Sequence, residues 1–157
     1  MPLRFLSLLI VLATLSGISR ADRGGPDAKD PVKVTLVVIL ASEEGTTIDK
    51  KLKALAQEVQ KLHPNLKSFK FKSQEVKSLK PNEKMSLPCV DEESVEMTIK
   101  HGADKENRVS VHVKPPTMSP FEYQTVCGKF LPIVTRYKTK KNETLILAIR
   151  VEPCRGE

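Results

Sequence analysis

The side chains that most often carry chemistry are few in this sequence and widely spaced. The chain has three histidines and three cysteines among 157 residues. No histidine stands at a metal-pair spacing from another histidine or from a cysteine, and there is no C-x-x-C pair. Neither a G-x-S-x-G elbow nor a glycine-rich phosphate or dinucleotide loop occurs. The sequence therefore predicts no catalytic residue, no metal site and no bound cofactor.

Two of the cysteines, Cys127 and Cys154, are predicted to form a disulfide. The first 21 residues, described below, predict export, and cysteines of exported proteins tend to pair, but three cannot all pair within one chain. If the last two predicted strands form a hairpin around Lys140 and Lys141, the numbers of facing residues add up to about 281, which places Cys127 opposite Cys154. Prolines near both cysteines leave open a bulge that shifts this register by one residue.

The third cysteine, Cys89, is predicted to be a free thiol. It follows Met85 and Leu87 at a spacing of two, on the apolar face of a predicted strand. Such a cysteine usually behaves as a small buried hydrophobic residue. The alternative is a reactive thiol or an intermolecular link. Because no histidine is adjacent to it in the sequence, burial is the favoured interpretation.

Positive charge is concentrated in residues 49–84, which hold ten lysines and four acidic residues, a net charge of +6. Such a surface attracts an anionic polymer, lipid head groups or an acidic protein, although a solvated surface is the simpler interpretation. Nucleic acid is not expected as a partner, because the segment has no arginine for base contacts and only two aromatic side chains for stacking. The residues predicted to face an anionic partner are Lys67, Lys70 and Lys72.

The first 21 residues have the layout of a signal peptide. Arg4 precedes the apolar run of residues 5–15, and the small residues Ser19 and Ala21 precede a cleavage point at Asp22. As a helix this run rises only about 16 Å, roughly half the thickness of the bilayer core, so no transmembrane segment is predicted. The expected organisation is a signal peptide (1–21), a flexible leader (22–30) and one domain (31–157), located in the periplasm or outside the cell.

Apolar periodicity predicts one strand and one helix in the first third of this domain. Residues 32–40 alternate, and their second half is apolar on both faces, which indicates a central strand. From Ile48 to Leu62, apolar residues recur every three or four positions, which predicts an amphipathic helix. Pro64 disfavours helical geometry at His63, so the helix should end there.

Beyond residue 65 the apolar period is two, which predicts a series of antiparallel strands. The expected fold class is therefore α+β, with the one helix packed on a mostly antiparallel sheet. A two-sheet β-sandwich that carries one helix is the alternative. The predicted strands include residues 121–127, 130–137 and 144–151.

The segment Thr125 to Tyr137 (TVCGKFLPIVTRY), taken with the signal peptide and the strand of residues 32–40, resembles small uncharacterised exported proteins of planctomycete-type bacteria. The resemblance spans most of the chain that follows the signal peptide. It implies no activity, cofactor or partner, so no functional residue is carried over.

The function expected from these features is a non-enzymatic extracytoplasmic module that binds or scaffolds an envelope macromolecule or an anionic polymer. One alternative is a hydrolase or thiol-dependent enzyme whose site is assembled from residues distant in sequence. A deep pocket that gathers His112, a carboxylate and a nucleophile would favour it. The other alternative is a self-associating structural envelope subunit, which an exposed strand edge would favour. The sequence does not determine the oligomeric state.

Overall fold

The computed structural model describes residues 30–104, 106–126 and 128–152. The predicted signal peptide, the leader up to residue 29 and both cysteines of the predicted disulfide lie outside these residues. The elements are β1 (Val32–Ser42), a 3-10 turn (Lys50–Leu52), α1 (Lys53–Leu62), β2 (Ser68–Leu79), β3 (Lys84–Pro88), β4 (Ser94–His101), β5 (Arg108–Lys114), β6 (Phe121–Val126), β7 (Phe130–Lys138) and β8 (Thr144–Glu152).

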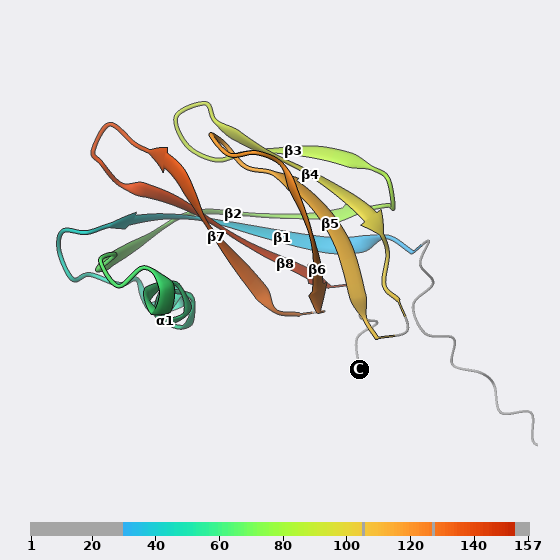
Figure 1. Ribbon diagram of the computed structural model, residues 1–157, viewed down its shortest axis with the longest axis horizontal. Helices are drawn as coiled ribbons and strands as arrows, with labels where there is room; N and C mark the ends of the chain where they lie inside the picture. Colours follow the sequence, from blue (N-terminus) through green and yellow to red (C-terminus); the bar gives the residue numbers. More distant parts are fainter. Residues whose placement is uncertain (1–29, 105, 127, 153–157) are drawn as a thin grey trace, which may run out of the picture.

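These strands form two four-stranded sheets. Sheet A has the order β2-β1-β8-β7, sheet B has the order β3-β4-β5-β6, and neighbouring strands in both are antiparallel. Figure 1 shows sheet B lying across sheet A, with α1 at one end of the molecule. The predicted combination of a single helix with antiparallel strands is confirmed for the described residues. Its division into two sheets corresponds to the sandwich alternative.

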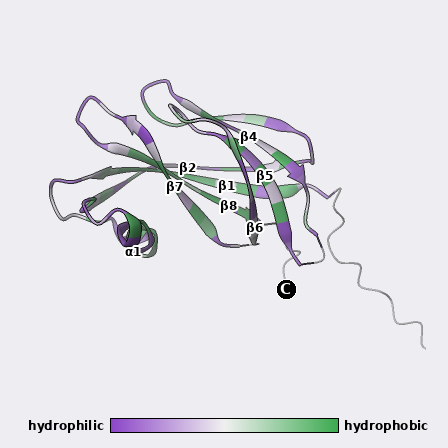
Figure 2. Ribbon diagram, viewed as in Figure 1, coloured by the Kyte–Doolittle hydropathy of each residue, from purple (hydrophilic) through white to green (hydrophobic). Residues whose placement is uncertain are grey.

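The main core lies between the sheets and follows from the period-two alternation of the strands. Every second residue of β4 and β5 points inward and is fully buried, whereas the residues between them are partly exposed. Figure 2 shows the hydrophobic residues running along the strands and hydrophilic ones at the hairpin tips. The inward residues of these two strands are Val95, Met97, Ile99, Val109, Val111 and Val113.

A second, smaller core lies between α1 and the outer face of sheet A. Leu52, Ala56 and Val59 are buried there against outward residues of β1 and β8, such as Ile39 and Ile146. β1 and β8 are thus covered on both faces, because one face meets sheet B and the other meets α1. This explains their nearly continuous apolar sequences, and it confirms that β1 is a central strand.

The helix begins later than the apolar period predicts. Ile48 forms an isolated parallel bridge with Phe69, and the Asp49 amide donates a hydrogen bond to the Phe69 carbonyl oxygen at 3.0 Å. A 3-10 turn follows, and α1 starts at Lys53. Pairing with the edge of β2 therefore overrides the helical period at Ile48 and Asp49. The helix ends at Leu62, as Pro64 predicts.

The hairpin of β7 and β8 has a register close to the expected one. Facing residue numbers add up to 280 from the Phe130 and Arg150 pair to the Val134 and Ile146 pair, and the register then shifts before Lys138 meets Thr144. The expected sum was about 281. The irregularity leaves extra residues in β7, where the Thr135 hydroxyl donates to the Leu145 carbonyl oxygen at 2.8 Å. The Cys127–Cys154 pairing stays a prediction.

Candidate functional site

Basic side chains gather at one end of sheet A, where β1 runs towards α1, β2 begins, and β7 turns into β8. All are exposed, and they come from segments far apart in the sequence. Carboxylates lie at the same end as well, among them those of Glu43, Asp49, Asp91 and Glu143. We call this surface the basic end and define it by seven residues: Lys67, Lys70, Lys72, Arg136, Lys138, Lys140 and Lys141.

The fold of β2 directs two of these lysines to the inner side of sheet A. Phe69 and Phe71 pack in the core beneath α1, so Lys70 between them lies on the opposite face of the strand. Val38 pairs with Ser73, but Ile39 pairs with Phe71, which makes Lys72 an extra, bulged residue. As a result Lys72 lines a pocket on the inner side of sheet A.

This pocket is open, with a volume of about 330 Å³, and it joins four parts of the chain. Leu40 and Lys72 come from the central and edge strands of sheet A. Val90 and Asp91 come from the β3–β4 turn, and the remaining lining residues come from the β7–β8 hairpin. The hairpin residues that line the pocket are Thr139, Lys140, Lys141 and Glu143. Three lysines thus lie around one concave surface.

The two carboxylates of this pocket already have partners. Lys70 Nζ lies 3.0 Å from Glu143 Oε1, and the Tyr137 hydroxyl donates to Asp91 Oδ2 at 3.0 Å. Among the described residues, no carboxylate lies within ion-pair distance of Lys72, Lys140 or Lys141. These three ammonium groups are therefore not neutralised by the described part of the protein and are available to an external anion.

A second open pocket lies beside the same hairpin. Arg136 and Lys138 line it from β7, and His63 lines it from the residue that follows α1. Its carboxylate is that of Glu43, whose Oε1 accepts a hydrogen bond from the Asn65 side chain at 2.7 Å. The hairpin therefore contributes basic side chains to two pockets.

Of the three predicted lysines, the structure brings two into this arrangement. Lys72 lines the first pocket, and Lys70 binds Glu143 at its wall. Lys67 lies just before β2, exposed, where its amide donates to the Ser42 carbonyl oxygen, and it lines neither pocket. The sequence interpretation missed the four basic residues of the segment 136–141 (RYKTKK). The sequence feature that could have identified them is the density of basic residues in this stretch, which fits a strand followed by a turn.

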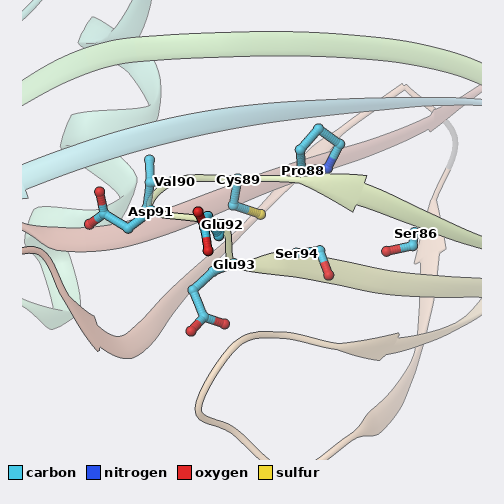
Figure 3. Close-up of a pocket in the computed structure, with 8 residues that line it drawn as sticks. All are labelled: Ser86, Pro88, Cys89, Val90, Asp91, Glu92, Glu93 and Ser94. Carbon is cyan, nitrogen blue, oxygen red and sulfur yellow. The ribbon is translucent and has the colours of Figure 1, made fainter.

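Cys89 lies in a different environment, an acidic turn between β3 and β4. Its side chain is half-buried and packs against the core, and its amide donates to the Glu93 carbonyl oxygen at 2.8 Å. Burial raises the pKa of the Cys89 thiol from 9.0 to about 11; a backbone hydrogen bond from Val95 opposes this shift, and the Glu93 charge adds a smaller increase. In Figure 3 the Asp91 and Glu93 carboxylates diverge from each other around the turn. Because the pKa of the Cys89 thiol is about 11, this free thiol is protonated at neutral pH.

The histidines do not assemble a catalytic group. His112 lies on the outer face of sheet B, with its Nδ1 3.6 Å from Glu122 Oε1, and it lines neither pocket at the basic end. His101 is exposed at the end of β4, and His63 follows the helix. Within the described ranges, no group of three or more histidine, cysteine, aspartate or glutamate side chains is placed to hold a metal ion.

Comparisons with protein-family models, with curated proteins and with solved structures found no match for this chain. The resemblance to exported proteins of planctomycete-type bacteria therefore stays a prediction. No helix of the described residues has the length and apolar character needed to cross a bilayer.

Proposed function

We propose that this protein is a non-enzymatic extracytoplasmic module that binds an anionic polymer, such as an acidic component of the cell envelope, through its basic end. The observation that carries the proposal is the grouping of Lys72, Lys140 and Lys141 around one pocket without carboxylate partners among the described residues. The signal-peptide layout predicted for residues 1–21 supports a location in the periplasm or outside the cell, which is part of the proposal.

The chemistry of the basic end favours a polymer over a small ligand. Lysine presents a flexible, strongly hydrated point charge, which suits contacts with many anionic groups better than one fixed geometry. Both pockets are open rather than enclosed, so they would surround little of a small molecule. Exposed charges interact through solvent over about 10 Å at 0.1 M salt. Binding should therefore be additive over several lysines and should weaken strongly as salt is added.

A thiol-dependent or hydrolytic enzyme has less support. The raised pKa of Cys89 disfavours the thiolate that a nucleophile requires. His112 is distant in sequence from Cys89 and lies on the outer face of sheet B, whereas Cys89 packs against the core between the sheets.

Charge reversal tests the proposal. The variant K67E/K70E/K72E should lose retention on a heparin column at low salt, and K140E/K141E should elute at clearly lower salt than the unaltered protein. Weaker retention is expected for both variants, because each substitution replaces an attraction between the basic end and the anionic polymer by a repulsion. The salt concentration at elution is the measured quantity.

A matched control separates a local site from overall charge. The variant K80E/K100E/K129E changes the net charge as much as the first variant does, and its substitutions lie away from the basic end. It should retain most of the binding. Equal losses in the control and in the basic-end variants would exclude a local site, and unchanged retention of the basic-end variants would refute the proposal.

A further inference from the structure

The outer edge of β2 is divided into a covered half and a free half. β2 is the last strand of sheet A on one side. Over its first residues the edge is covered, because Phe69 exchanges backbone hydrogen bonds with Thr47 and Asp49, and the Phe71 amide donates to the Asp49 carboxylate at 2.6 Å. From residue 72 to residue 79, no described segment pairs with this edge. The free half is eight residues long.

The bulge at Lys72 decides which backbone groups the free half presents. Before the bulge, Phe69 and Phe71 turn their backbone groups outward, as their bonds to residues 47–49 show. An extra residue reverses this alternation, so beyond Lys72 it is the even-numbered residues whose N–H and C=O groups point away from β1. These outward-facing residues are Gln74, Val76 and Ser78.

The side chains of the free half are complementary to a second copy of themselves. Around Val76, which is 45% exposed, the neighbours are Glu75 on one side and Lys77 on the other. In an antiparallel pair of two such strands centred on Val76, residue 75 of one copy faces residue 77 of the other. Each Glu75 would then meet a Lys77, and the two valines would meet each other. Neither Glu75 nor Lys77 has an ion-pair partner among the described residues.

We propose that two copies of this protein associate through the free half of β2, in an antiparallel, two-fold symmetric arrangement centred on Val76. The two A sheets then form one continuous eight-stranded sheet. The outward backbone groups of residues 74, 76 and 78 bond to residues 78, 76 and 74 of the other copy. Glu75 and Lys77 form the closer, non-hydrogen-bonded pairs, in which cross-strand side chains interact best.

The other strand edges are less suited to this pairing. β7 contains Pro132 and a register irregularity, β3 has five residues and ends in Pro88, and β6 has six residues. Charged residues on an edge strand usually prevent association. In the free half of β2, however, the acidic and basic residues flank a central position symmetrically, so the same charges favour self-pairing in one register.

Variants with reversed charges at residues 75 and 77 test this interface. Their dimerisation is measured by sedimentation equilibrium of the purified protein at low salt. E75K places lysine opposite lysine, and K77E places glutamate opposite glutamate, so each variant should weaken the dimer by about tenfold or more. The double variant E75K/K77E restores opposite charges and should dimerise as the unaltered protein does. An equimolar mixture of E75K and K77E should form the mixed dimer.

Cysteine cross-linking tests the register. V76C places two cysteines in a directly facing pair, with Cα atoms about 5.5 Å apart, so mild oxidation should link two copies through residue 76. S78C should not link to itself, but it should link to Q74C when the two variants are mixed. Peptide mass spectrometry distinguishes these links from those of the native cysteines. A monomer at all concentrations, a dimer indifferent to E75K and K77E, or a link at residue 78 alone would each overturn the proposal.

Discussion

At the scale of single residues, Cys89 is the group whose chemistry the fold changes most clearly. It is half-buried against the core, and its Sγ donates a hydrogen bond to the Leu87 carbonyl oxygen at 3.8 Å. Both burial and the neighbouring Glu93 charge disfavour the thiolate, which is the reactive form of the side chain. Cys89 therefore serves packing in this fold, as its spacing from Met85 and Leu87 predicts.

The raised pKa makes a kinetic prediction. A shift from 9.0 to about 11 lowers the thiolate fraction at neutral pH by about a hundredfold. Iodoacetamide at pH 7.5 should therefore label Cys89 in the folded protein about a hundred times more slowly than in the urea-unfolded protein. The folded-state rate should keep rising with pH up to about 11. Peptide mass spectrometry locates the label, and equal rates in the two states would contradict the assignment.

At the scale of elements, α1 shows how tertiary packing selects among the residues of an amphipathic stripe. Leu52, in the 3-10 turn, is 2% exposed beneath the helix, whereas Leu62 belongs to the same predicted stripe and is 82% exposed. The stripe predicted the helix and part of its buried face, since Leu52 and Val59 are buried as expected. It could not show that residues 47–49 would pair with the edge of β2, because that contact depends on a strand 20 residues further along the chain.

A pair of identical substitutions tests this packing. Leu52→Ala removes a fully buried side chain from the core between α1 and sheet A, and it should lower the free energy of unfolding by about 2 to 5 kcal/mol. Leu62→Ala changes an exposed position, and its effect should stay within about 0.5 kcal/mol. Urea unfolding followed by circular dichroism measures both. Similar losses in the two variants would show that α1 packs differently.

At the scale of the whole molecule, the sequence predicted the elements better than their assembly. The alternation in β4, β5 and β8 reveals half-buried and doubly buried strands from local pattern alone. Whether such strands form one sheet or two depends on long-range pairing, which no local pattern specifies. The same limit applies to the site. Lys70 and Lys72 were identifiable as a basic cluster, but their proximity to Lys140 and Lys141 follows from β1 pairing with both β2 and β8.

The most direct test of the central claim is to map where an anionic polymer binds. The isotope-labelled protein is titrated with a heparin oligosaccharide at low salt, and its backbone amide resonances are followed by nuclear magnetic resonance. Binding through the basic end predicts that the largest shifts fall in residues 67–73 and 136–143 and disappear when salt is raised to about 0.5 M. Shifts centred on the outer face of sheet B, or no shifts at any concentration, would contradict it.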